Sequence, residues 1–337
     1  MGILEGSPVP ETYAGPVANQ PWWGTHPGAT FLPENLTGTD MMVAGGIDWL
    51  VSKRRLFPEG LDGEVLPNAE ENWVAVHRDT DNAFLGMVTP SYHTFQNGEM
   101  VEMTDKVLGM TGAHYHTAGS LYGGKLVWVL AEFDGEYHIK GDGSPHRNYL
   151  LGITGHTGRH ALTFVATPVR VWCGNTAAAA VDGANARINL RHTSGMGERV
   201  AEVQKALDLH VKYVDTYEAA MNRLAVRDFD AKEFRALAEV LTPVTLNDGA
   251  KPEVIARRIA KAEAKRDAMT NLFIASPTLD GVSNSAYRAL QAVIEYVDHY
   301  DLPADTTKAS GNDRQATSLY DGDGYDLKSR AAALLGA

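Results

Sequence analysis

Cysteine is almost absent from this chain, and the scarcity narrows the compartments in which the protein would work. Cys173 is the one cysteine among 337 residues, so no disulfide can form within the chain, and a reducing compartment is indicated. The first residues lack the basic and apolar regions of a secretory signal peptide. No apolar run approaches the roughly 20 residues that span a bilayer. We therefore expect a cytoplasmic protein with no membrane partner.

Basic charge is also scarce. Acidic residues outnumber lysine and arginine by 42 to 30, which gives a formal net charge of −12. Such a balance argues against a protein that binds polyanions over its whole surface, because phosphate attraction needs clustered basic side chains. The hydrophobic content of 44% is ordinary for a packed globular protein, and the length allows two or three domains.

Hydrophobic periodicity separates the chain into a β part and a helical part. Apolar residues alternate in three pairs of segments, which predict β-hairpins over 73–88, 113–133 and 149–165 in one antiparallel sheet. Helical spacing predicts short helices over 39–53 and 98–108, an apolar stripe over 200–217, and helices over 229–241, 251–273 and 283–300. The expected fold class is α+β, with an antiparallel hairpin-rich β core followed by a helical C-terminal region.

Composition suggests four segments along this chain. Residues 1–38 are rich in Pro, Gly and Thr and are expected to form an extended arm. Residues 39–196 form the predicted α+β core, and residues 197–300 form the helical region. Residues 301–337 are polar and glycine-containing and are expected to be a flexible tail.

One segment is basic in this acidic protein. Residues 143–197 hold a single acid, Asp182, against five arginines: Arg147, Arg159, Arg170, Arg187 and Arg191. Within the segment, Gly152, Gly155 and Gly158 recur every third residue. Backbone N–H groups in glycine-rich turns cradle phosphate, and neighbouring arginines add charge-assisted hydrogen bonds. The candidate contacts for phosphate or nucleic acid are the five arginines with Gly155, His156, Gly158 and His160. The alternative is a hairpin loop whose glycines only permit its geometry.

Other chemistry has weaker signals. His114 and His116 have the spacing that puts two rings on one face of a strand, but no third ligand of the usual kind is evident, so no metal is expected. Cys173, between apolar neighbours, is interpreted as a packed thiol. Trp22 and Trp23 are expected to dock against the body of the protein or a neighbouring subunit, because two exposed tryptophans would favour association.

The segment 170–176 reads Arg-Val-Trp-Cys-Gly-Asn-Thr and ends in Asn175, a predicted N-cap, and Thr176. It resembles the Arg-Val-x-Cys-x-Asn-Thr signature of a phage- and plasmid-encoded family classed as a domain of unknown function, number 932. The resemblance covers roughly residues 20–195 and includes, in the same order, segments 21–24, 46–49, 85–88, 96–97 and 118–124, with Arg78 and Tyr92.

This chain departs from the family pattern at two places. The family usually has Trp-His-Gly where Trp23 occupies the middle position here, and His-Asp-Gly-Ser where residues 156–159 read His-Thr-Gly-Arg. The second change removes a carboxylate from the turn and adds positive charge. The family has no established activity, so the resemblance implies only a context, that of mobile elements expressed in the cytoplasm of a bacterial host.

The leading hypothesis is a non-enzymatic nucleic-acid-binding protein, a single-strand annealing or recombination accessory without a cofactor. A single strand would lie along the basic segment and stack bases on aromatic rings, for which Tyr115, Tyr149 and Trp172 are the candidates. The first alternative is a self-assembling or host-interaction protein that contacts protein through its helical third. The second is a metal-dependent enzyme acting on nucleotides or phosphoesters through its paired histidines. A homo-oligomer is expected under the leading hypothesis.

Overall fold

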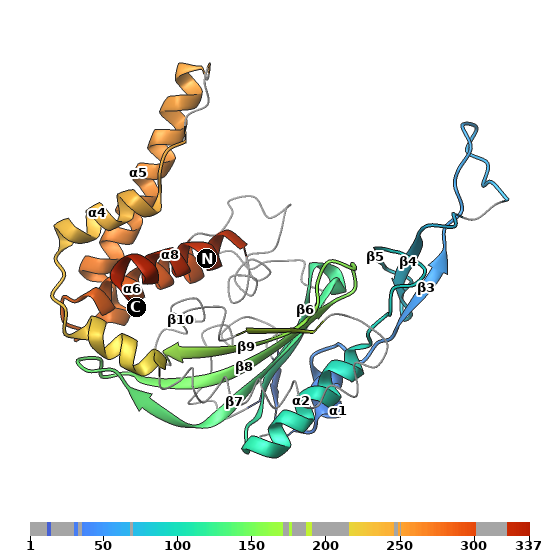
Figure 1. The fold of residues 1–337 in the computed structure, drawn as a ribbon, viewed down its shortest axis with the longest axis horizontal. Coiled ribbons are helices and arrows are strands. Elements are labelled where there is room, and N and C mark those ends of the chain that lie inside the picture. Colours follow the sequence, from blue (N-terminus) through green and yellow to red (C-terminus); the bar gives the residue numbers. More distant parts are fainter. Residues whose placement is uncertain are drawn as a thin grey trace. The chain divides into compact units, whose positions relative to one another are not determined.

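The structure of this chain is a computed structural model (Figure 1), and it describes residues 12–14, 30–32, 36–67, 70–170, 175–176, 187–190, 216–245, 249, 251–300 and 322–337. The chain divides into two compact units. The first unit comprises residues 1–134, 149–166 and 186–210, and the second comprises residues 135–148, 167–185 and 211–337. No helix in the described ranges combines the length and the apolar composition that crossing a bilayer requires.

A three-stranded antiparallel sheet in the first unit has the order β3 (Val51–Arg55), β4 (Val74–Arg78) and β5 (Phe84–Val88). The β4–β5 pair is the first predicted hairpin. The polar turn between these strands includes Asn82, which has a positive φ of 60°. Two shorter strands, β1 (Thr12–Ala14) and β2 (Thr30–Leu32), pair in parallel within the segment predicted to be an extended arm.

A six-stranded antiparallel sheet has the order β10–β9–β8–β7–β6, and β11 also pairs with β9. Its strands are β6 (His114–Leu121), β7 (Leu126–His138), β8 (Pro145–Gly155), β9 (Leu162–Arg170), β10 (Asn175–Thr176) and β11 (Arg187–Leu190). The turn η3 (Tyr122–Gly124) joins β6 to β7, and Tyr122, Gly123 and Gly124 all have positive φ values, which the two glycines adopt without steric cost. β6–β7 and β8–β9 are the second and third predicted hairpins.

Two helices pack on β6 in the first unit. Helix α1 (Gly38–Ala44) starts at a capping box, in which the Thr37 hydroxyl accepts a hydrogen bond from the Asp40 N–H. Helix α2 (Asn97–Thr111) ends at Gly112, whose φ of 72° suits a residue without a Cβ. The buried Tyr115 of β6 donates its hydroxyl to the Asp105 carboxylate at 2.8 Å, so the contact joins α2 to the sheet.

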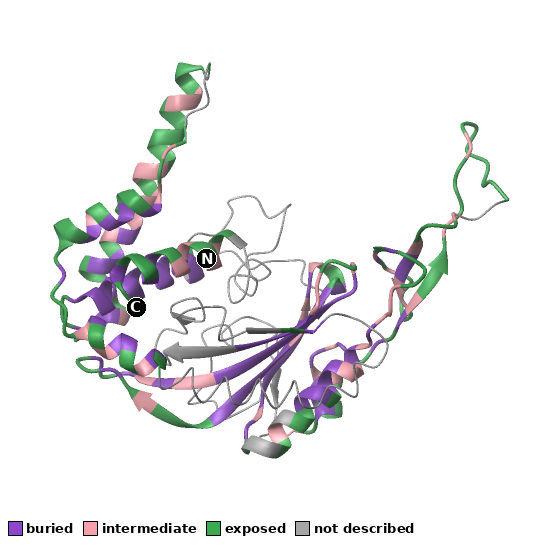
Figure 2. Ribbon diagram, in the orientation of Figure 1, coloured by how far each residue is buried: buried purple, intermediate pink, exposed green. Residues whose placement is uncertain are grey.

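The helices of the second unit build a separate core (Figures 1 and 2). They are residues 216–225, α4 (Ala231–Leu241), α5 (Pro252–Ala275), the turn η5 (Pro277–Leu279), α6 (Ala286–Glu295), the π-helical turn η6 (Tyr296–Tyr300) and α8 (Gly322–Leu335). Phe234 of α4 stacks on Phe273 of α5, with ring centroids 4.7 Å apart. The buried Arg288 of α6 donates to the carbonyls of Phe273, Leu279 and Val282, which ties α5 and η5 to α6.

The α+β fold class predicted from the sequence is confirmed, and three details differ from prediction. The helix expected over 39–53 ends at Ala44, because Gly45 and Gly46 interrupt it, and residues 51–55 form β3. The three hairpins lie in two sheets and not in one. The end of the expected flexible tail is helix α8, in which Lys328, Ala331 and Ala332 are buried. The stripe predicted over 200–217 lies almost wholly outside the described residues.

Candidate functional site

The glycine-spaced loop after β8 is closely packed. A Cβ on Gly155 would lie 2.8 Å from the His160 Cβ and 2.9 Å from the Leu126 side chain. At Gly158 a Cβ would lie 2.9 Å from the Val88 side chain, and the φ of this residue is 76°. Close approach and positive φ therefore account for these glycines. Phosphate binding by their N–H groups stays a prediction.

The basic residues of segment 143–197 occupy different surroundings. Arg159 is exposed on the loop after β8. Arg147 is half-buried in the second unit, and its Nε lies 3.9 Å from the Glu136 carboxylate. His156 is buried in the core of the first unit and faces away from solvent. Arg170 and Arg187 are in β9 and β11, with side chains outside the described structure, and Arg191 lies outside the described residues.

Several other candidates also lie partly or wholly outside the described residues. Trp22, Trp23 and Cys173 do so completely. The backbone of Asn175 pairs with Arg170 across β10 and β9, and the helix that Asn175 was predicted to cap lies outside the described residues. Tyr115 and Tyr149, expected to stack on bases, are buried, because the sheet core encloses both rings.

The paired histidines of β6 interact with carboxylates of β7. The His116 Nε2 lies 3.6 Å from the buried Glu132, and the His114 Nδ1 lies 3.8 Å from the exposed Asp134. A register shift between Tyr115 and Thr117 interrupts the regular alternation at His116. Within the described part of the chain, no three His, Cys, Asp or Glu side chains are grouped so as to hold a metal ion.

Segments that carry the family resemblance meet around Trp49 in the first unit, and we call Trp49, Arg78, Asn97, Gly124 and His156 the signature cluster. The Asn97 amide donates to the Ile47 carbonyl at 2.9 Å, and its oxygen contacts the His156 Nε2 at 2.9 Å. The His156 ring packs edge-on against Trp49, with centroids 5.3 Å apart. The Arg78 guanidinium lies over the Trp49 ring, 5.3 Å from its centroid.

Gly124 completes the signature cluster. Its φ is 92°, and a Cβ there would lie 2.9 Å from Arg78 Nη1 and 3.3 Å from the Trp49 ring. Trp49, Asn97 and His156 are at most 6% exposed, so their contacts lie in the interior of the first unit and stabilise it. Sequence reasoning placed His156 with the phosphate contacts; its buried hydrogen bond to Asn97 gives it a role in packing.

Arg78 also forms an ion pair with Asp81, through which the stability of the first unit is expected to depend on pH. Arg78 donates to both carboxylate oxygens of Asp81, at 2.9 and 2.6 Å, and these hydrogen bonds lower the pKa of Asp81 to about 2. An unfolded aspartate has a pKa of about 3.9. The contribution of the pair is therefore present above about pH 4 and is lost as the pH falls through about 2.

We expect Asp81→Asn to flatten the dependence of unfolding free energy on pH between pH 4 and pH 2, measured by urea unfolding. Arg78→Met removes the same ion pair and should flatten the same window. The double variant should then add little to either single change. If Asp81→Asn kept the full wild-type slope between pH 4 and pH 2, the assignment of this pair would be wrong.

A second cluster lies in the second unit and joins Asp142 and Ser144 to Tyr287 of α6. Asp142 accepts hydrogen bonds from the Ser144 hydroxyl at 2.8 Å and the Tyr287 hydroxyl at 2.6 Å. The Tyr287 hydroxyl also lies 3.0 Å from the His146 Nε2. These residue types serve in acid–base catalysis. All four are at most 5% exposed, so the cluster anchors the loop before β8 to α6.

Helix α5 separates its charges between two faces. Arg235 of α4 binds Glu263 and Asp267 of α5, and the hydrogen bond that it donates to the Asp267 carboxylate raises the pKa of Arg235. Arg266 donates to the Thr242 carbonyl at 2.8 Å. Glu263 and Asp267 of α5 are thus both paired with Arg235, on the face of α5 that packs against α4.

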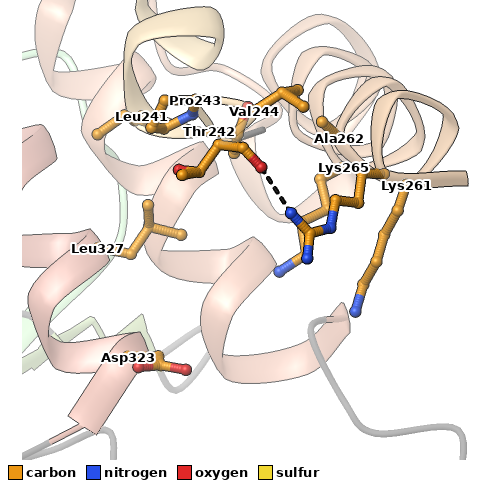
Figure 3. Close-up of a pocket in the computed structure, with 11 residues that line it drawn as sticks. Leu241, Thr242, Pro243, Val244, Lys261, Ala262, Lys265, Asp323 and Leu327 are labelled. Carbon is orange, nitrogen blue, oxygen red and sulfur yellow. Dashed lines mark hydrogen bonds between the residues drawn. The ribbon is translucent and has the colours of Figure 1, made fainter. Parts of the chain in front are cut away.

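The other face of α5 lines a groove with a volume of about 600 Å³ (Figure 3), which we call the α5 groove. Its basic residues are Arg258, Lys261 and Lys265, which recur at helical spacings of three and four. The facing helix α8 contributes Asp323 and Leu327. The remaining lining is largely apolar: Leu241, Thr242, Pro243, Val244, Thr245 and Ala262. Arg258 and Lys261 are exposed, so three positive charges face one carboxylate across a partly apolar groove.

A family model described as "Domain of unknown function (DUF932)" matches residues 84–321. The chain belongs to the DUF932 family. The region matched in DUF932 contains Asn97, Gly124 and His156 of the signature cluster and the basic face of α5. Trp49 and Arg78 precede it, and the whole of α8 follows it. No curated protein and no solved structure matches the chain.

Sequence reasoning missed the basic face of α5, although a signal was present. Residues 251–275 contain six basic against three acidic residues. A simple count of charges does not reveal the basic face, because the three acids offset part of the positive charge. Only the structure shows that Glu263 and Asp267 are paired with Arg235 on the opposite face of the helix. Plotting the charges of this DUF932 chain by helical face would have separated Arg258, Lys261 and Lys265.

Proposed function

We propose that this chain is a nucleic-acid-binding protein that holds a single strand in the α5 groove. The observation that carries the proposal is the separation of charge on α5. In a protein of net charge −12, Arg258, Lys261 and Lys265 gather beside an apolar groove, while Glu263 and Asp267 are occupied by Arg235. Clustered positive charge is the feature that phosphate recognition requires.

The dimensions of the groove favour a single strand. Arg258 and Lys265 are seven residues apart, or about 10 Å along the helix axis, which is about three phosphates at a rise of about 3.4 Å per nucleotide. A volume of about 600 Å³ suits one or two nucleotides and is too small for a duplex. The apolar side chains Pro243, Val244 and Leu327 offer contact surface to unstacked bases.

In this proposal the protein acts in the cytoplasm, as a single-strand annealing or recombination accessory of a mobile element. Arg159 supplies a separate exposed positive charge on the loop after β8. The basic segment expected from the sequence and the α5 groove are distinct candidates for phosphate contact. They are tested separately by substitution.

The test is the affinity for a fluorescent single-stranded oligonucleotide, measured by anisotropy between about 20 and 200 mM salt. Three phosphate contacts predict a slope of log K against log salt concentration of about −2, and Arg258→Ala with Lys261→Ala should make it shallower by about 1.4. Arg159→Ala should make the slope shallower by about 0.7 if the loop after β8 also contacts phosphate. Binding should weaken equally for all sequences, because backbone contacts carry no base information.

A matched control removes two exposed lysines of the first unit, Lys106→Ala with Lys125→Ala. This variant has the same net charge as the groove variant and should keep the wild-type slope. Absence of any salt-sensitive binding by the wild-type protein at low salt would reject the proposal. Equal losses in the control and the groove variant would reject the groove as the site.

A further inference from the structure

A small hairpin beyond β3 exposes apolar side chains, and we call residues 56–67 the acidic hairpin. Figure 2 colours most of its residues as exposed. Its exposed apolar residues are Phe57 at 49%, Leu61 at 113%, Val65 at 65% and Leu66 at 43%. Large apolar side chains gathered on one protruding segment mark an interaction site.

The acidic hairpin is held in shape by its own backbone. Gly60 donates to the Glu64 carbonyl at 2.7 Å, and Leu66 donates to the Pro58 carbonyl at 2.8 Å. Gly63 adopts a φ of 83° at the turn, and Glu59 forms a β-bridge with Val65. Such a hairpin presents its side chains in one arrangement, so docking it costs little conformational entropy.

The charge of this segment has one sign. Glu59, Asp62 and Glu64 are exposed, and residues 56–67 contain no lysine, arginine or histidine. The acidic hairpin therefore carries three negative charges beside apolar side chains. A surface that matches it must be apolar with a basic rim, and must be recessed to receive a protruding tip such as Leu61.

The α5 groove has these properties. It is recessed, and its apolar lining comprises Leu241, Pro243, Val244, Ala262 and Leu327. The three positive charges of Arg258, Lys261 and Lys265 outnumber the single negative charge of Asp323. The two surfaces belong to the same polypeptide, so every copy of the chain supplies both. The partner that this complementarity specifies is therefore a second copy of this chain.

We propose that the acidic hairpin of one copy docks into the α5 groove of a second copy, so that the protein assembles head to tail. Leu61 and Val65 would enter the apolar part of the groove, and Asp62 and Glu64 would meet Lys261 and Arg258. A head-to-tail contact is heterologous and leaves one hairpin and one groove open at the ends, so assembly extends with concentration. The consequence for nucleic acid rests on the proposed function: the hairpin and the strand compete for one groove.

The test uses charge reversal and complementation, read as mass by light scattering during size exclusion. The mass of the wild-type protein should rise above that of the monomer as the protein concentration is raised. It should fall back toward the monomer mass at high salt. Asp62→Lys with Glu64→Lys, and separately Arg258→Glu with Lys261→Glu, should each weaken assembly by on the order of tenfold or more, because like charges would then face each other. An equimolar mixture of the two reversed variants should assemble again, since each contact regains opposite charges.

Circular dichroism on both variants shows whether they remain folded, and Leu61→Ser weakens the contact without any change of charge. A wild-type protein that is monomeric at all concentrations would overturn the proposal. So would reversed variants that still assemble, or a mixture that fails to recover. Strand binding by Leu61→Ser should equal or exceed that of wild type, because its groove is intact and less occupied.

The outcomes separate the two proposals. Assembly that follows charge reversal, without any oligonucleotide binding, keeps the docking and removes the nucleic-acid function. Oligonucleotide binding without assembly does the reverse. If both occur, a saturating single-stranded oligonucleotide should return the wild-type assembly to monomers, and an unchanged mass would reject the competition.

Discussion

Replacing Lys328 by alanine should lower the free energy of unfolding by about 3–5 kcal/mol, the typical cost of leaving a buried charge unpaired. The Lys328 Nζ of α8 donates to the Asp298 carboxylate of η6 at 2.9 Å. Both side chains are at most 2% exposed. Removing the ammonium leaves the carboxylate in the interior of the second unit with its principal counter-charge gone. Urea unfolding followed by circular dichroism measures the loss.

Two further variants test whether the loss comes from leaving a buried charge unpaired. Lys232→Ala removes an exposed lysine of α4 and should change stability by less than about 0.5 kcal/mol. The double variant Lys328→Met, Asp298→Leu should recover most of the loss, because apolar residues of similar volume replace buried ion pairs at little cost. A Lys328→Ala protein as stable as the Lys232→Ala control would show that the pair is not buried in solution.

We expect Trp49→Ala to cost a similar amount, about 3–5 kcal/mol, because it removes the centre of the signature cluster. Trp49 is 6% exposed, contacts the His156 ring and the Arg78 guanidinium, and donates its indole N–H to the Gly46 carbonyl at 2.9 Å. The substitution therefore leaves a cavity where several segments of the first unit meet. Thermal and urea unfolding report the loss.

Trp73 provides a matched control for Trp49. It is 47% exposed just before β4, so Trp73→Ala removes the same side chain with a much smaller loss of buried contact. A loss for Trp73→Ala as large as that for Trp49→Ala would contradict the central position of Trp49. The comparison also separates a general effect of removing a tryptophan from the specific effect of opening the signature cluster.

Local patterns predicted most of the elements that the structure contains. The alternation around 74–78 and 84–88, and the Gly123–Gly124 turn, predicted hairpins correctly, because period-two side chains and positive φ are properties of neighbouring residues. Helices α4 and α5 were predicted nearly to their ends for the same reason. Strand β3 was missed, because Lys53, Arg54 and Arg55 show no alternation and the strand depends on pairing with β4.

The sequence by itself determined the α+β class, the hairpins, the main helices and membership of a family whose motifs lie far apart along the chain. Only the tertiary structure decided what those motifs do. It brought Trp49, Asn97 and His156 together in a buried cluster, and it used Gly155 and Gly158 for close packing. It also paired Glu263 and Asp267 with Arg235, which leaves the opposite face of α5 basic. Burial and charge pairing depend on residues remote in sequence, and for that reason neither could be derived from local patterns.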